Sequence, residues 1–214
     1  MYLEIKGVSR QIKQEMVLNQ VDLQMEKGKA YLLLGKNGAG KTMLMRAISG
    51  LIRLDEGEIW INEKRLWKEI SFPESMGILL ENPGFVKAYS GYENLMLLAS
   101  IRKKVGEREV LQALEKVGLK ENMHKKYRKY SLGMKQKLGI AAAIFEQPDL
   151  ILLDEPTNAL DEKSVQDCLK ILQEEKERGA LLLISSHNPE EFMDLADEMI
   201  YMDAGRIKKK EMKC

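Results

Sequence analysis

The chain has 214 residues, of which 44% are apolar, and its 34 Lys and Arg residues nearly balance its 33 Asp and Glu residues. This length suits one α/β domain, and a formal charge of +1 gives no general bias toward nucleic acid or an anionic membrane surface. The longest apolar runs fall far short of the roughly 18 to 20 residues that a membrane span requires, and the N-terminus lacks a signal-peptide pattern. We therefore expect a cytoplasmic protein with no nucleic-acid partner and no direct membrane insertion.

Two kinds of strand are predicted along the chain. Apolar and polar residues alternate in 2–6, 21–25 and 58–62, as they do when one face of a sheet is wet, so these segments predict an antiparallel sheet. Nearly every residue is apolar in 30–34, 76–80, 150–154 and 181–185. Such strands belong in the middle of a parallel sheet that helices cover on both faces. The prediction is an α/β fold with a mostly parallel sheet and a separate antiparallel β subdomain.

A phosphate-binding loop follows the first apolar strand. The segment "GKNGAGKT" at 35–42 leads into a helical pattern that Gly50 terminates, and this strand, loop, helix order is what a P-loop requires. Its glycines let backbone N–H groups point at phosphates, Lys41 neutralises the β and γ phosphates, and the Thr42 hydroxyl ligates Mg²⁺. The predicted nucleotide-binding residues are Gly35, Lys36, Asn37, Gly38, Ala39, Gly40, Lys41, Thr42 and Met43.

Residues 84–146 predict helices inserted into the sheet. Ser90 and Glu93 form a capping-box pattern before a helix with Leu95, Leu98 and Ile101 on one side. A second helix runs from about 107 to 117 and ends at Gly118. The segment "KYSLGMKQKLGIA" at 129–141 opens a third, with Ser131 as its N-cap. A helix start attracts anions because its first N–H groups are unpaired, so the chain carries a second anion-seeking element.

Acidic residues follow the apolar strand at 150–154. Asp154 at the strand end would lie near the metal, and Glu155 would point toward the γ-phosphate and act as the general base for water. Farther along, Cys168 falls with Val165, Leu169 and Leu172 at helical spacing, which indicates a small core residue.

Five motifs together resemble the ATP-binding cassette (ABC) ATPases. They are, in the family's order, "GKNGAGKT", "YSLGMKQK", "LILLDEP", "NALD" at 158–161 and "SSHNPEE" at 185–191. The resemblance covers essentially the whole chain and implies a single ABC ATPase domain, with residues 1–83 and 147–214 as the nucleotide-binding core and 84–146 as the helical signature subdomain. With "ENPGFVKAYSGYENLMLLA" at 81–99, it looks most like cassettes that pair with separate membrane subunits to export drugs or antimicrobial peptides.

This resemblance implies how the site is assembled and used. Two cassettes, copies or paralogues, would pair head to tail, so that Ser131 and Gly133 of one close over ATP held on Lys41 of the other. His187 would contact the γ-phosphate and hold the attacking water, and Asp161 would cross the dimer interface. The ATP cycle would drive an integral membrane permease, docked beside Phe85, Tyr89 and Tyr92, which would hold the subunit at the cytoplasmic face of the cell membrane. Packing inside the subdomain is the alternative for these three aromatic residues.

The sequence departs from the family pattern at several positions. Leu132 stands where glycine is usual and would be strained if its φ were positive, and Met134 replaces the usual glutamine. Glu81 replaces another glutamine and still offers Mg²⁺ a carboxylate. The aromatic residue that usually stacks on adenine would fall near Ile12, so we expect poor discrimination between bases and comparable ATPase and GTPase rates.

Two other functions are compatible with a P-loop. A P-loop kinase would pass the phosphate to a small acceptor, but Glu155 is placed for water and no arginine-rich lid is recognisable. A cassette without a membrane partner, as in translation or DNA-repair factors, commonly carries two cassettes or a long coiled coil, and this sequence has neither.

Overall fold

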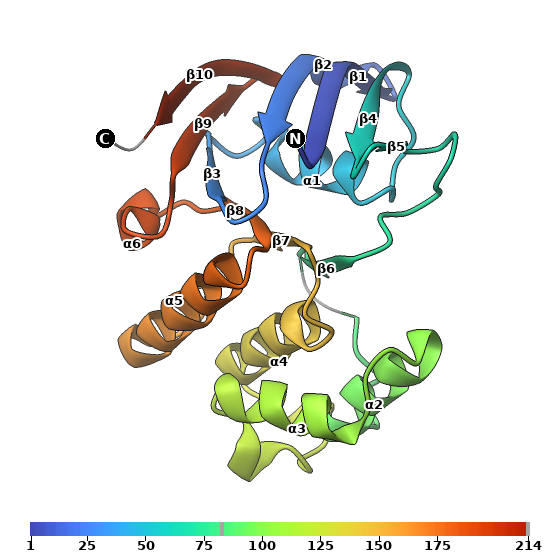
Figure 1. The fold of residues 1–214 in the computed structure, drawn as a ribbon. Coiled ribbons are helices and arrows are strands. Elements are labelled where there is room, and N and C mark those ends of the chain that lie inside the picture. Colours follow the sequence, from blue (N-terminus) through green and yellow to red (C-terminus); the bar gives the residue numbers. More distant parts are fainter. Residues whose placement is uncertain (82–83, 213–214) are drawn as a thin grey trace.

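A six-stranded sheet forms the centre of the computed structural model, which describes residues 1–81 and 84–212. The strand order is β10–β9–β3–β8–β7–β6, parallel except for the antiparallel pair of β9 and β10. The bounds are β3 (Ala30–Leu34), β6 (Met76–Leu79), β7 (Leu150–Asp154), β8 (Leu181–Ser185), β9 (Glu198–Asp203) and β10 (Arg206–Met212) (Figure 1). The mostly parallel sheet is confirmed, although β6 lies at its edge rather than in its middle.

A four-stranded antiparallel sheet lies beside it, in the order β2–β1–β4–β5. Its strands are β1 (Leu3–Ile12), β2 (Glu15–Met25), β4 (Glu56–Ile61) and β5 (Lys64–Arg65). The three alternating segments fall on β1, β2 and β4, so the predicted antiparallel sheet is confirmed. A tight turn joins β1 to β2 and places Ile12 opposite Glu15.

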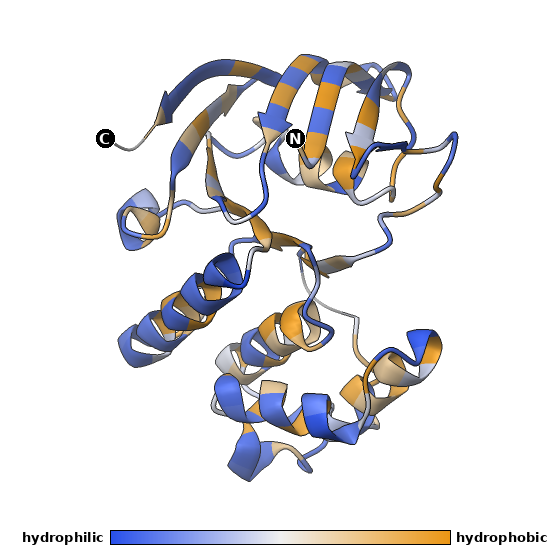
Figure 2. Cartoon of the chain, in the orientation of Figure 1, coloured by the Kyte–Doolittle hydropathy of each residue, from blue (hydrophilic) through white to orange (hydrophobic). Residues whose placement is uncertain are grey.

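Alternate residues of the central strands pack into two different hydrophobic cores. In β3, Leu32 faces the core that contains α4 and α5, whereas Leu33 faces the core shared with α1 and the antiparallel sheet. The inner strands are apolar throughout because both of their faces are covered (Figure 2).

Helices complete both layers. Helix α1 (Lys41–Ile48) packs between the two sheets, and α5 (Glu162–Glu177) covers the other face of the central sheet. The short α6 (Pro189–Phe192) comes after β8. Cys168 of α5 is buried, which raises the pKa of its thiol to about 12 and confirms it as a core residue. Within the described residues, no helix combines the length and apolarity needed to cross a bilayer.

Three helices pack together below the central sheet: α2 (Gly91–Arg102), α3 (Glu107–Lys116) and α4 (Leu132–Ile144). Two 3₁₀ turns, Lys120–Asn122 and Tyr127–Lys129, join α3 to α4. The Ser90 hydroxyl accepts from the Glu93 N–H while the Glu93 carboxylate accepts from the Ser90 N–H, as the sequence predicts. Ile101 differs from the prediction, because 71% of it is exposed. The division at 83/84 stays a prediction, and residues 82–83 lie outside the described ranges.

Candidate active site

The loop between β3 and α1 has the backbone that a P-loop requires. Gly38 has φ 79° and Gly40 has φ 103°, a region that favours glycine. A Cβ at Gly40 would lie 2.7 Å from the Val17 carbonyl oxygen, whereas one at Gly38 would meet no atom within 4 Å. Lys41 begins α1, and its Nζ donates to the Gly35 carbonyl at 2.6 Å. The positive φ values of the glycines and the packing of Gly40 against β2 therefore determine the shape of this loop at the N-terminus of α1.

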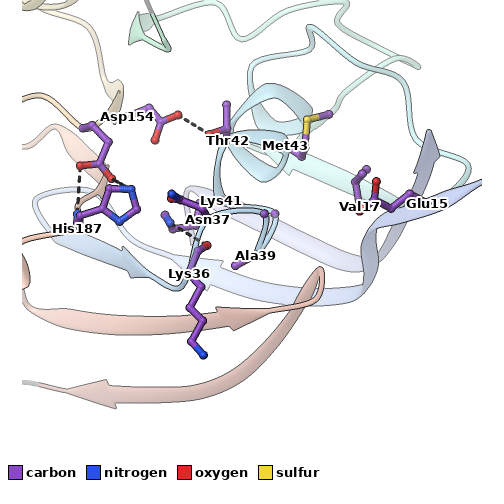
Figure 3. A pocket seen from close by; sticks show the side chains of 13 residues that line it. Glu15, Val17, Lys36, Asn37, Ala39, Lys41, Thr42, Met43, Asp154 and His187 are labelled. Carbon is purple, nitrogen blue, oxygen red and sulfur yellow. Dashed lines mark hydrogen bonds and ion pairs between the residues drawn. The ribbon is translucent and has the colours of Figure 1, made fainter. Parts of the chain in front are cut away.

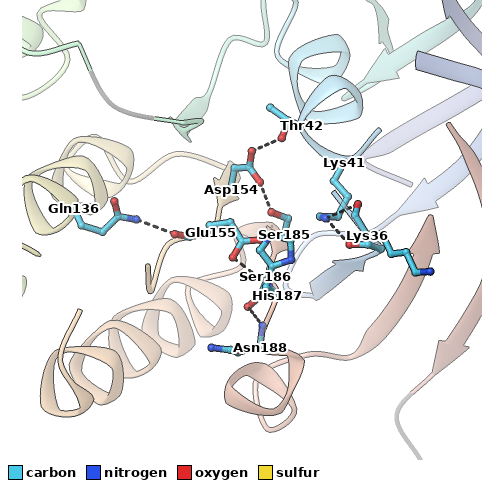
Figure 4. Close-up of polar contacts among 11 residues, drawn as sticks. Lys36, Lys41, Thr42, Gln136, Asp154, Glu155, Ser185, Ser186, His187 and Asn188 are labelled. Carbon is cyan, nitrogen blue, oxygen red and sulfur yellow. Dashed lines mark hydrogen bonds and ion pairs between the residues drawn. The ribbon is translucent and has the colours of Figure 1, made fainter. Parts of the chain in front are cut away.

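Asp154 joins this loop to the end of the central sheet. The Thr42 hydroxyl donates to Asp154 Oδ2, and the Ser185 hydroxyl donates to Asp154 Oδ1 (Figure 4). Because β7 and β8 are parallel neighbours, with Asp154 directly opposite Ser185, both side chains emerge at the same edge. Thr42 and Asp154, the predicted metal pair, are thus brought together.

Glu155 and His187 also meet at this edge. The His187 backbone N–H donates to Glu155 Oε2 at 3.1 Å, and its imidazole Nε2 lies 3.3 Å from Glu155 Oε1. Glu155 has φ 51°, an uncommon value for a residue with a side chain, and strain of this kind often occurs at functional sites. Two of the three predicted catalytic residues, of which Lys41 is the third, are therefore neighbours, with 25% of the Glu155 side chain and 52% of the His187 side chain exposed.

Two residues that sequence reasoning missed contact Asp154 and the backbone of Glu155. Ser185 holds Asp154, as described above, and Gln136 of α4 donates its amide Nε2 to the carbonyls of Glu155 at 2.9 Å and Pro156 at 3.0 Å. Gln136 lies within the quoted signature "YSLGMKQK" and Ser185 within "SSHNPEE", so the motifs marked the segments but not these contacts. Helix α4 is thereby tied to the loop that carries Glu155.

The predicted P-loop residues from Lys36 to Met43, with Asp154, Glu155 and His187, line one cavity of about 330 Å³, together with Glu15 and Val17 of β2. Gly35 was also predicted to bind the nucleotide, but it is not among the described lining residues. Asp154 and His187 lie at one end of it, the P-loop in the middle, and Glu15 and Val17 at the other end (Figure 3). The described lining residues are Glu15, Val17, Lys36, Asn37, Gly38, Ala39, Gly40, Lys41, Thr42, Met43, Asp154, Glu155 and His187.

Glu81 and Ile12 are not brought to this cavity. Glu81 Oε1 accepts from Arg46 Nη2 at 2.9 Å, and 59% of the Glu81 side chain is exposed, so the structure does not place it with the predicted metal pair. Ile12 lies at the β1–β2 turn and does not line the cavity. Glu15, which is paired with Ile12 across the turn, does line it.

Ser131 and Gly133 line a second cavity of about 590 Å³, which shares no described residue with the first. Ser131 caps α4, and its hydroxyl accepts from the Met134 N–H at 3.2 Å. Leu132 has helical backbone and 69% exposure, so the strain considered for it does not arise.

Asp161 also lines this second cavity, and it caps α5. Its Oδ1 accepts from the Ser164 N–H at 2.8 Å, and this hydrogen bonding, with the charge of Lys137 nearby, lowers the pKa of the Asp161 carboxyl. In the single chain its carboxylate thus serves its own helix.

Comparisons with known proteins agree with this geometry. The model of the family described as "ABC transporter" matches residues 18–158. An uncharacterized ABC transporter ATP-binding protein of Bacillus subtilis, YybJ, is 45% identical over 98% of this chain and 96% of its own length. The bacitracin transport ATP-binding protein BcrA of Enterococcus faecalis is 38% identical over 96% of this chain and 67% of its own length.

A solved structure shows the same fold. It is the ATP-binding subunit of an ABC transporter, 28% identical, with a TM-score of 0.89 over 99% of this chain and 90% of its own. The family model, the relatives and the shared fold all agree with a nucleotide site in which a P-loop, two neighbouring carboxylates and a histidine meet at one edge of the sheet. The chain belongs to the ABC transporter family, as an ATP-binding subunit that hydrolyses ATP.

Proposed function

We propose that this subunit pairs with a second cassette, a copy or a paralogue, and drives a separate membrane permease that exports an antimicrobial compound. One observation carries the pairing: Ser131 and Gly133 line a cavity with no described residue in common with the P-loop cavity. A helix start that cannot serve its own nucleotide suits a nucleotide held by a partner. The similarity to a bacitracin transport subunit supports an antimicrobial cargo. Through the permease, the subunit would lie at the cytoplasmic face of the cell membrane.

The residues at the sheet edge suit in-line attack by water on the γ-phosphate. Glu155 takes the proton from the attacking water, His187 holds that water and the γ-phosphate, and Lys41 balances charge on the β and γ phosphates as ADP leaves. Thr42 and Asp154 offer the oxygen donors that Mg²⁺ prefers, and the bound ion would neutralise phosphate charge.

Glu155→Gln tests both the chemistry and the pairing. An amide cannot take the proton, so we expect hydrolysis to fall by about a hundredfold or more while ATP binding is kept, and the variant to elute as a dimer with ATP on gel filtration. Glu63→Gln, an exposed substitution in the turn before β5, is the control and should behave as the wild type. A Glu155→Gln chain that binds ATP but stays monomeric would contradict the pairing.

The permease-facing surface is proposed at Tyr89, before α2. Of the three aromatic residues considered, Phe85 packs edge-on against Tyr127 with ring centroids 5.3 Å apart, and the Tyr92 hydroxyl donates to Glu107. Tyr89 is 43% exposed and is joined at the surface by Val86, which is 41% exposed. Aromatic residues of this kind suit a partner helix.

Tyr89→Ala should uncouple transport from hydrolysis. The substitution removes the exposed ring but keeps the backbone bonds of Tyr89 with Val86 and Tyr127, so basal ATPase activity should not change. Transport by vesicles that contain the permease would be measured, with Met193→Ala, 40% exposed in the segment after α6, as the control. Unchanged transport in Tyr89→Ala would argue against this surface.

A further inference from the structure

The nucleotide cavity has two ends of different chemistry. Asp154 and His187 mark the end where the γ-phosphate reacts, and the P-loop lies in the middle, so the base must extend toward β2. This orientation rests on the proposed function in one respect: it assumes that the cavity binds a nucleoside triphosphate.

The β2 end offers the base two apolar side chains and one carboxylate. Val17 and Met43 supply the apolar contacts, and a thioether packs well against an aromatic ring. Glu15 supplies the carboxylate. Within the described lining residues the aromatic rings are limited to the His187 imidazole at the opposite end, so stacking cannot dominate recognition of the base.

The backbone fixes how far Glu15 lies from the phosphates. The Val17 carbonyl is packed against Gly40 of the P-loop, where a Cβ would approach it to 2.7 Å. Glu15 is two residues earlier in the same strand, on the same face and about 7 Å farther along. Within the described residues, no hydrogen bond or ion pair engages the Glu15 carboxylate, so it is free to accept hydrogen bonds from a ligand.

We propose that Glu15 reads the Watson–Crick edge of the base and favours guanine over adenine. Guanine presents two adjacent donors, N1–H and the 2-amino group, which a carboxylate accepts with its two oxygens. Adenine presents its 6-amino donor beside the N1 lone pair, which repels the second oxygen. The comparable use of ATP and GTP expected from the missing aromatic residue is therefore tilted toward GTP by Glu15.

Competition for a bound fluorescent nucleotide by ATP, GTP and ITP tests this without relying on turnover. GTP should bind the wild type about tenfold more tightly than ATP, because hydrogen bonds to a charged group are strong. ITP keeps N1–H but lacks the 2-amino group and should fall between the two.

Glu15→Ala should bring the dissociation constants of the three nucleotides to within about twofold of one another, with ATP binding retained as evidence of a folded site. The kcat/KM values for GTP and ATP should converge in the same way. Met16→Ala is the matched control, because Met16 is the next residue of β2, lies on the opposite face and is 45% exposed. It should keep the wild-type preference.

Two results would overturn the inference alone: a wild type that binds ATP more tightly than GTP, or a Glu15→Ala variant that keeps the wild-type ratio. Failure of all three nucleotides to displace the probe from the wild type would instead overturn the nucleotide site itself, and with it this inference.

Discussion

Asp154 is held by hydrogen bonds from two hydroxyls that come from different elements. Thr42 approaches from α1 and Ser185 from β8, each toward a different carboxylate oxygen. A carboxylate held on both sides loses less rotamer freedom when it contributes to a metal or water network, since its orientation is already fixed. Ser185 is fully buried, so its hydroxyl acts only through Asp154.

Ser185→Ala should therefore reduce ATP turnover by about tenfold or more, which corresponds to the loss of one hydrogen bond to a charged group. ATP affinity should change little, because the P-loop is untouched. Steady-state ATPase assays and nucleotide titration would be compared with Ser100→Ala, an exposed serine of α2. Wild-type turnover in Ser185→Ala would show that Asp154 needs no such support.

At this scale the motif residues could be predicted and their supporting contacts could not. Lys41, Thr42, Asp154, Glu155 and His187 line one cavity because each follows an apolar strand that the sequence reveals. Glu15 and Gln136 lie in β2 and α4, and whether their side chains reach the cavity wall or the Glu155 carbonyl depends on packing between elements that are distant in the sequence.

The backbones of β6 and α4 approach each other very closely at Gly77. A Cβ at Gly77 of β6 would lie 1.7 Å from the Ala143 carbonyl oxygen, so only glycine allows the helix backbone to approach this edge strand. The contact explains why β6 is apolar although it lies at the sheet edge: α4 covers it.

Gly77→Ala should destabilise the fold by about 1 to 3 kcal/mol, the usual cost of forcing an extra carbon into a packed interior. Urea unfolding would measure the free energy of unfolding. Gly106→Ala is the control, because a Cβ there would meet its nearest atom, a Glu109 carboxylate oxygen, at 3.9 Å. Equal stability in the two variants would mean that α4 moves away from β6 without cost.

The pairing of β9 with β10 could not be predicted from the hydrophobic pattern of the sequence. Strand β10 carries five charged residues and no buried one, so it lacks the apolar run or clean alternation that identified the other strands. It forms because the turn at Ala204 and Gly205, both with positive φ, folds it back onto β9, and β9 is in turn paired with β3. The formation of β10 therefore depends on tertiary contacts that its own sequence does not reveal.

Over the whole molecule, α4 connects the two cavities. Its start, Ser131 and Gly133, lines the second cavity, while Gln136, little more than one turn later, holds the carbonyl of Glu155 in the first. In the proposed dimer, a partner's nucleotide that moved the start of α4 would also move the loop that carries Glu155, the proposed general base. The two sites would then be mechanically connected through α4.

In the proposed pairing, turnover would depend on the partner's signature segment. The wild-type chain is first diluted until its hydrolysis per chain falls. Adding an excess of Glu155→Gln chain with ATP should then restore a burst of about one ADP per wild-type chain, because the inactive chain still supplies Ser131. The double variant Glu155→Gln, Ser131→Arg keeps its P-loop but blocks the start of α4, so it should give no burst in rapid-quench measurements. Equal bursts with both helpers, or turnover per chain that does not fall on dilution, would mean that each cassette hydrolyses ATP alone.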